Sequence, residues 1–257
     1  MTETEGILGL SGRRALITGG SRGVGRAVAR LLARAGAHVG VAYRTREAEA
    51  QSILQEVSRF GVQGWAHPGD LQDPGSVKRL FDGFEEVFGG VDIVVGNHGI
   101  WPAEDVPLAG MELEQWRRTM GVNLDAMFLV CREAARRLSS HGRLIVVTST
   151  AAQRGEAGHG DYAASKGALN ALVKGLAEEL GPRDITVNAV APGWIDTDMT
   201  SEVLVGSLRE RALGQIPLGR IATPEDVAGP IVFLASKLAR HVTGEVLNVN
   251  GGSVRPG

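Results

Sequence analysis

The sequence predicts an α/β fold in which a doubly wound parallel sheet of about seven strands forms one domain. Short apolar segments alternate with longer amphipathic segments along all 257 residues. No linker, repeat or low-complexity tract divides the chain, and a cluster of glycines directly follows the first apolar segment. Apolar strands that alternate with helices are typical of parallel sheets buried on both faces, so we expect a single domain over residues 1–257.

The first half of the chain begins the alternation. The segment RALITG (14–19) is an apolar run of strand length, and GRAVARLLARAG (25–36) follows it with helical spacing and ends at a glycine. The pattern continues through strands at 37–44, 62–70 and 91–97 and helices at 47–61 and 74–90, the last with a proline near its start.

The second half repeats the pattern with longer helices. The amphipathic segment 114–138 predicts one long helix, and the apolar run GRLIVVTST (142–150) predicts the strand after it. The remaining segments predict a helix at 162–181, a strand at 185–193, a looser region at 194–223, a helix at 224–236 and a last strand at 244–252.

Composition excludes several classes of protein. The net charge is −2, which gives no sign of a nucleic-acid or anionic-membrane partner. Cys131 is the only cysteine and lies in an amphipathic segment, so we expect a buried thiol and no disulfide or cysteine-based metal site. The N-terminus does not resemble a signal peptide, and no apolar run reaches the roughly 18 residues of a membrane span. We therefore expect a cytoplasmic protein.

The glycine cluster TGGSRGVG (18–25) lies between the first strand and the first helix. Glycines at such a turn let a pyrophosphate approach the backbone closely, and the helix N-terminus offers it free N–H groups. The spacing differs from the G-x-G-x-x-G fingerprint, and a flexible turn is the alternative interpretation. We expect a dinucleotide-binding turn formed by Gly19, Ser21, Arg22, Gly23, Val24 and Gly25.

The second predicted strand ends in AYRTRE, where a cofactor without a 2′-phosphate usually meets an acidic residue. This chain has Tyr43 and Arg44 there, and Arg22 in the glycine turn. Guanidinium groups suit a 2′-phosphate because they donate charge-assisted, often bidentate hydrogen bonds. We therefore predict NADP in preference to NAD, with Glu47 as the residue that most opposes this assignment.

Tyr162 and Lys166 are four residues apart in DYAASKG (161–167), so they share one face of the predicted helix. A nearby ammonium favours the phenolate and lowers the pKa of a tyrosine, which can then exchange a proton with a carbonyl oxygen. Ser149 follows an apolar strand and could hold the same oxygen. A Tyr and a Lys at this spacing also occur by chance in packed helices. The glycine turn and Ser149 favour the catalytic interpretation.

These motifs, with GNHG (96–99), VN (122–123) and APGWIDTDM (191–199), occur in an order that resembles the short-chain dehydrogenase/reductases with a single Rossmann-like domain. The resemblance implies an NAD(P)-dependent oxidoreductase. It also implies a catalytic tetrad of Asn123, Ser149, Tyr162 and Lys166. Tyr162 would be the acid/base, Ser149 would bind the substrate oxygen, and Lys166 would bind the nicotinamide ribose and depress the pKa of the tyrosine. Asn123 would hold a water that links Lys166 to solvent.

The same resemblance places further residues along the cofactor. In addition to Tyr162 and Lys166, these are Asp70, Leu71, Asn97, His98, Gly99, Pro192, Gly193, Ile195 and Thr197. The family usually has Asn-Asn-Ala-Gly where this chain has GNHG, so one asparagine is lost and His98 replaces a small residue. His98 would contact the ribose or phosphates, or turn outward to solvent. The other histidines show no ligand spacing around it, so we expect no metal.

The sequence says less about the substrate than about the cofactor. Residues 194–217 should form a lid, with Trp101 and Trp194 narrowing the pocket. The chain is most similar to the 3-oxoacyl-carrier-protein reductases of fatty acid biosynthesis, which implies reduction of a 3-oxoacyl thioester with NADPH. Arg183 stands at one basic docking position for the acidic carrier protein, but Ser140 occupies the other. Reductases of sugars, polyols, steroids and xenobiotic ketones share most of the motifs.

Two further expectations concern class and assembly. Some relatives bind NADP as sensors or scaffolds without turnover, but they typically lose the tyrosine or lysine that this chain keeps. A dehydratase or epimerase would need a different glycine spacing and a longer chain. The resemblance also implies a homotetramer built through the helices at 114–138 and 162–181, whose apolar stripes are wide.

Overall fold

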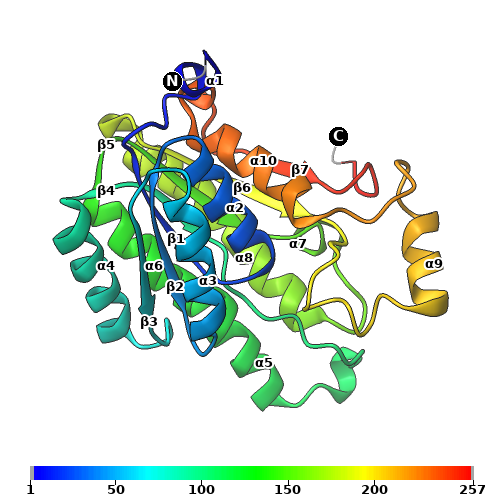
Figure 1. The fold of residues 1–257 in the computed structure, drawn as a ribbon. Coiled ribbons are helices and arrows are strands. Elements are labelled where there is room, and N and C mark those ends of the chain that lie inside the picture. Colours follow the sequence, from blue (N-terminus) through cyan, green and yellow to red (C-terminus); the bar gives the residue numbers. More distant parts are fainter. Residues whose placement is uncertain (1–2, 256–257) are drawn as a thin grey trace.

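The computed structural model describes residues 3–255, and its ribbon is a single parallel sheet between two layers of helices (Figure 1). Residues 1, 2, 256 and 257 of the predicted domain lie outside the described residues. The strands run in the order β3-β2-β1-β4-β5-β6-β7, with every pair parallel. They are β1 (Arg14–Thr18), β2 (His38–Tyr43), β3 (Gly64–Pro68), β4 (Val91–Gly96), β5 (Leu138–Val147), β6 (Thr186–Pro192) and β7 (Val246–Val249). The predicted fold class is confirmed.

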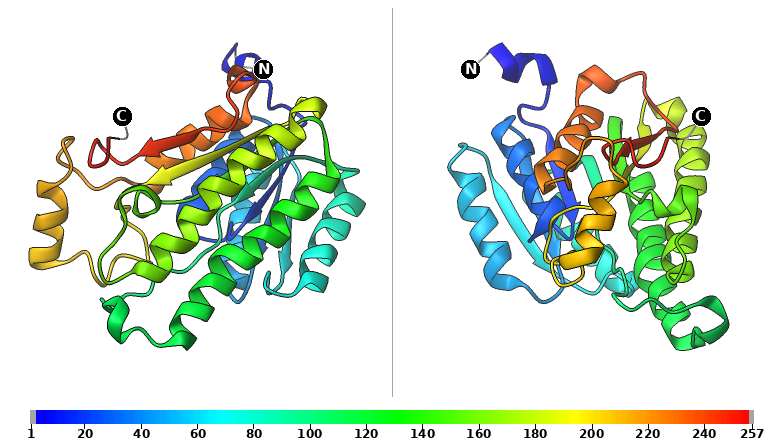
Figure 2. Two further views of the ribbon diagram at one scale, coloured as in Figure 1. Left: turned by 180° about the vertical axis from the view of Figure 1, so that it is seen from behind. Right: turned by 90° about the vertical axis from the view of Figure 1, so that its right-hand side faces the viewer.

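The helices cover both faces of this sheet. They are α1 (Glu3–Leu8), α2 (Gly23–Arg34), α3 (Glu47–Ser58), α4 (Pro74–Phe88), α5 (Leu113–Met120), α6 (Ala126–Arg137), α7 (Ala151–Arg154), α8 (Gly160–Leu180), α9 (Gly206–Gly214) and α10 (Pro224–Ala235). Helices α2, α3 and α10 pack on one face, and α4, α6 and α8 pack on the other (Figure 2). Side chains alternate accordingly along β1, where Ala15 and Ile17 face the first layer and Leu16 faces the second.

The predicted helix 114–138 is interrupted. A π-helical turn at Gly121–Asp125 separates α5 from α6, and Asn123 lies within it. Such turns insert an extra residue into a helix and frequently occur at functional sites. The turn brings the side chain of Asn123 to the backbone of Ile100, a contact between segments far apart in the sequence.

The looser region at 194–223 contains a helix that the sequence did not predict. Helix α9 stands away from the sheet in Figure 1, and its Ala212 packs into a small separate core with Leu204, Ile216 and Ile221. Because α9 covers this local cluster and not the sheet, its apolar stripe is short and the helical pattern is weak.

The strand order reverses between β1 and β4, which pair in parallel with Ile17 opposite Val95. In open α/β sheets, ligands bind at the carboxyl edge beside such a reversal.

Two other expectations concern residues away from this edge. Cys131 is buried in α6 as predicted, and burial raises the pKa of its thiol to about 12. Among the described residues, no helix is both long and apolar enough to cross a membrane.

Candidate active site

The glycine turn is held at the carboxyl edge of β1. Gly19 and Gly23 have φ angles of 64° and 50°, in the left-handed region that favours glycine. Gly25 leaves space for the preceding turn, because a Cβ there would lie 2.3 Å from the carbonyl oxygen of Gly19. The side-chain amide of Asn97 donates to the carbonyls of Thr18 and Gly19, each at 3.1 Å, and so ties the turn to the end of β4.

We expect Gly25→Ala to lower the free energy of unfolding by about 1–3 kcal/mol, as overpacking does elsewhere. The added methyl group would also displace the backbone of Gly19, so NADPH should bind more weakly. Thermal unfolding and titration by nicotinamide fluorescence measure the two effects. Gly229→Ala in α10 is the matched control, since a Cβ there has no heavy atom within 4 Å. Equal melting temperatures for the two variants would contradict the expectation.

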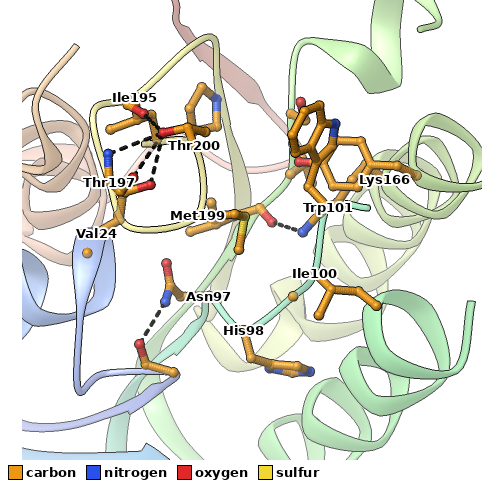
Figure 3. A pocket seen from close by; sticks show the side chains of 18 of the residues that line it. Val24, Asn97, His98, Ile100, Trp101, Lys166, Ile195, Thr197, Met199 and Thr200 are labelled. Carbon is orange, nitrogen blue, oxygen red and sulfur yellow. Dashed lines mark hydrogen bonds between the residues drawn. The ribbon is translucent and has the colours of Figure 1, made fainter. Parts of the chain in front are cut away.

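A cavity of about 730 Å³ opens at this edge of the sheet (Figure 3). Most of the predicted site residues line it: Gly19, Ser21, Arg22, Gly23, Val24, Tyr43, Arg44, Asp70, Leu71, Asn97, His98, Gly99, Ser149, Tyr162, Lys166, Pro192, Gly193, Ile195 and Thr197. Gly25 and Asn123 do not line it, because Gly25 lies beneath the turn and Asn123 behind Ile100.

The cavity wall fits a dinucleotide at the glycine turn. The backbone of Gly23 and Val24 begins α2 at the wall, and no side chain caps this helix N-terminus. Its free N–H groups are therefore directed toward the space that a pyrophosphate would fill. A side chain at Gly19 would meet the backbone of His98 at 3.2 Å, so the close passage of the two strand ends depends on this glycine.

Three arginines gather where the second strand ends. Arg22, Arg44 and Arg46 line the cavity, whereas Glu47 does not. The guanidinium groups of Arg22 and Arg46 lie 3.6 and 3.8 Å from the carboxylate of Asp198 in the lid. Arg46 was not among the predicted residues, although its place in AYRTRE was a usable signal. An anion can therefore be held here by two or three cations.

Ser149, Tyr162 and Lys166 meet at the other part of the cavity. The Lys166 Nζ donates to the carbonyl of Val147 at 2.9 Å and lies 6.0 Å from the centre of the Tyr162 ring. The backbone N–H of Ala151 donates to the Ser149 Oγ at 3.1 Å, which fixes that oxygen and leaves the hydroxyl proton free to be donated. The three side chains come from the end of β5 and the first turns of α8.

The expected low pKa of Tyr162 is corrected by these surroundings. Burial raises the pKa of the tyrosine to about 12, and the charge of Glu156 adds to the rise, while a hydrogen bond with Ser149 opposes it. Burial also lowers the pKa of Lys166 to about 8, so the lysine is still mostly protonated near neutral pH but loses its charge above about pH 8. The cost of burying the phenolate outweighs the hydrogen bond with Ser149.

The side chain of Asn123 makes hydrogen bonds with two neighbouring segments. Its Oδ1 accepts from the N–H of Ile100 at 2.8 Å, and its Nδ2 donates to the Ile100 carbonyl at 2.9 Å and to Ser165 at 3.2 Å. These bonds fix the segment after β4 against α8. Gly99 fits between Asn123 and Lys166, since a Cβ there would lie 3.1 Å from the Asn123 Oδ1 and 3.3 Å from the Lys166 Nζ.

His98 turns into the protein, so of its two expected orientations the one toward solvent is wrong. Its Nδ1 lies 2.8 Å from the hydroxyl of Thr18, and its Nε2 is enclosed with no partner among the described residues. Burial, with the nearby charge of Lys166, lowers the pKa of His98 to about 3. A neutral imidazole therefore lines the cavity beside the end of β4.

The substrate side of the cavity contains side chains that the sequence did not single out as a site. Trp101 and Trp194 lie edge to face with their centres 5.7 Å apart, as expected for residues that narrow the pocket. Arg154, the last residue of α7, and Glu156, in the loop after it, also line the wall. Their only sequence signal was their position between Ser149 and Tyr162. Lid residues complete the wall: Asp198, Met199, Thr200, Ala212, Gln215 and Ile216.

A dinucleotide-sized cavity that joins a glycine turn to a Ser, Tyr and Lys group can support hydride transfer at a carbonyl. A family model described as enoyl-(acyl carrier protein) reductase matches residues 19–253. The chain belongs to the short-chain dehydrogenase/reductase family and is an oxidoreductase of the kind that uses NAD(P).

Individual relatives are similar over nearly the whole chain. The 3-oxoacyl-(acyl-carrier-protein) reductase FabG of Aquifex aeolicus is 38% identical, over 95% of this chain and 98% of that protein. The L-rhamnose 1-dehydrogenase (NAD(P)(+)) of Azotobacter vinelandii is 41% identical, over 92% and 94%. A short chain dehydrogenase from Burkholderia cenocepacia, solved in complex with NADP, has a TM-score of 0.90 at 37% identity and covers 95% of this chain and 98% of that one.

Proposed function

We propose that this protein transfers a hydride between NADP(H) and a carbonyl carbon or secondary alcohol. The observation that carries the proposal is the meeting of Ser149, Tyr162 and Lys166 in the same cavity as the glycine turn and three arginines. A bound nicotinamide supplies or accepts the hydride. Absorbance of the reduced nicotinamide, followed with both cofactors and a panel of ketones, diols and acyl thioesters, tests the proposal. No turnover with any of them would contradict it.

Each side chain has a separate task in this proposal. In the reductive direction the Tyr162 hydroxyl gives its proton to the substrate oxygen, and Ser149 donates a hydrogen bond to the same oxygen. Lys166 spends one N–H on the Val147 carbonyl, which leaves two donors for ribose hydroxyls and for the developing phenolate. Asn123 acts as a positioning residue through Ile100.

The preference for NADP is supported by the arginines. We expect Arg44→Asp to reduce the ratio of kcat/KM for NADPH to that for NADH by about 10- to 100-fold, since a charged hydrogen bond to the 2′-phosphate is lost. Steady-state kinetics with each cofactor measure the ratio. Arg59→Asp is the matched charge reversal, because Arg59 is exposed and lies outside the cavity. If this ratio is the same in Arg44→Asp as in the natural protein, the assignment of NADP as the preferred cofactor is wrong.

A 3-oxoacyl thioester is the first candidate substrate. It is supported by the FabG relative and by apolar lid residues at the wall, among them Met199 and Ile216. The carrier protein has less support, because Arg183 is half-buried and its guanidinium donates to the backbone carbonyls of Ala135 and Leu138. That arginine is therefore occupied within the fold. A thioester of a short pantetheine analogue should be reduced about as well as the carrier-bound form.

A hydroxylated substrate of the sugar or polyol kind is the second candidate. It is favoured by the carboxyl of Glu156 and the ring of Trp101 at the cavity wall. The L-rhamnose 1-dehydrogenase relative supports it independently.

We also propose a homotetramer built through α5, α6 and α8. Phe128 of α6 is 47% exposed, and small residues are exposed along α8, where they allow close helix approach. Light scattering should give the mass of four chains, and Phe128→Glu should give smaller species. A monomeric natural protein would contradict the proposal.

A further inference from the structure

Glu156 is a carboxyl group that this fold keeps at the substrate side of the cavity. Only 13% of its side chain is exposed, and it lines the cavity together with Tyr162. Its charge is one of the influences that raise the pKa of Tyr162, after burial. None of the tasks assigned above to the catalytic group uses it.

The surroundings of Glu156 stabilise its charge only in part. The charges of His159 and Arg154 and the nearby indole of Trp101 favour the carboxylate, and the Arg154 Nη2 lies 3.8 Å from its Oε1, beyond hydrogen-bond distance. Burial nevertheless dominates and raises the pKa of Glu156. A carboxylate in this condition still has lone pairs for a donor that enters the cavity.

Trp101 is held rigidly beside this carboxyl. Its ring stacks on His159 at 4.5 Å with an interplanar angle of 11°, and it meets Trp194 edge to face. His159 is itself buried and lies 3.2 Å from Asp105 through its Nδ1. The tryptophan therefore offers a fixed apolar surface next to a hydrogen-bond acceptor, as needed for a molecule with both C–H faces and hydroxyl groups.

We propose that Glu156 and Trp101 form a specificity subsite that selects a substrate with a hydroxyl group near the reacting carbon, of the sugar or polyol kind. The hydroxyl donates to the Glu156 carboxylate, while a C–H face of the substrate lies against Trp101. A plain acyl chain would remove water from the carboxylate without supplying a donor, and an unpaired buried polar group is costly. This inference rests on the proposed oxidoreductase function and chooses between its two candidate substrates.

The test compares matched substrates and variants. The natural protein should favour a sugar lactol or polyol over its deoxy analogue, and over a 3-oxoacyl thioester of N-acetylcysteamine. Glu156→Leu should lower kcat/KM for the hydroxylated substrate by about 10- to 100-fold, as expected for a lost hydrogen bond to a charged group. The same variant should leave the deoxy analogue unchanged or improve it. Glu86→Gln, on an exposed position of α4 outside the cavity, controls for surface charge.

A binding measurement separates this inference from the proposed function. Calorimetry on the NADP⁺ complex of Tyr162→Phe should show tighter binding of the polyol than of its deoxy analogue, and Glu156→Leu in that background should abolish the difference. If nothing is turned over but this difference is found, the subsite stands and the oxidoreductase proposal fails. If Glu156→Leu changes neither the kinetic nor the binding preference, or if the thioester is the better substrate in the natural protein, the subsite is overturned.

Discussion

Tyr162→Phe will reduce kcat by about 10²- to 10⁴-fold, the range that positioned proton transfer contributes, while NADPH still binds. Phenylalanine keeps the ring between Ser149 and Lys166 but has no proton to give to a substrate oxygen. Single-wavelength absorbance of reduced nicotinamide gives the rate, and nicotinamide fluorescence gives the affinity. The variant should have the same melting temperature as the natural protein, because the ring and its packing are retained.

This result also decides between an enzyme and a sensor. A sensor or scaffold would bind NADPH without turnover, so the natural protein and Tyr162→Phe would both show no activity. Turnover within a factor of two of the natural protein in Tyr162→Phe would instead show that another group moves the proton. His98 also lines the cavity, but its pKa of about 3 leaves it neutral and a weak acid near neutral pH.

Lys166→Ala is expected to have the second largest effect, because two functions are lost together. The ribose donors disappear, and the charge that favours the phenolate disappears with them. We expect kcat/KM to fall by about 10²-fold or more through loss of positioning and proton transfer. Full kinetics over a pH series measure the change, and Lys78→Ala on the exposed face of α4 is the matched control.

The effect of Lys166→Ala on the pH dependence of the rate has a definite direction. Without the ammonium the pKa of Tyr162 rises further, so the oxidative reaction, which needs the phenolate, begins at a higher pH. The difference between variant and natural protein should be greatest below about pH 8, since the pKa of Lys166 is lowered to about 8 by burial and the charge is lost above it. Superimposable profiles would show that Lys166 acts only through the ribose.

Much of the fold is predictable from the sequence because it depends on local pattern. Strands β1, β2, β4 and β6 are short apolar runs buried from both sides, so their places along the chain follow from the alternation. The π-helical turn is different. Nothing in GVNLD breaks a helix, and the turn is fixed by the bonds between Asn123 and Ile100, which form only when distant segments meet.

Some residues of the candidate site are likewise predictable from the local sequence, and others are not. Residues that touch the cofactor cavity through the backbone, such as Gly19 and Gly23, are predictable because strand ends determine their place. Glu156 is not predictable, since its position depends on how a loop closes around the cavity, whereas Arg46 could have been found from its place in AYRTRE. The pKa of Tyr162 cannot be predicted from the spacing of Tyr162 and Lys166 either, because burial, which the sequence does not give, is the largest influence on it.

The buried thiol of Cys131 makes this chain a convenient host for a spectroscopic label. A thiol whose pKa is raised to about 12 has almost no thiolate at neutral pH, and Cys131 is also buried in α6. Maleimide reagents should therefore not react with it. A single cysteine placed at Val205, which is 59% exposed in the lid, would then carry the dye alone. Its emission would report directly on lid movement as NADPH and substrate arrive, without any other residue being altered.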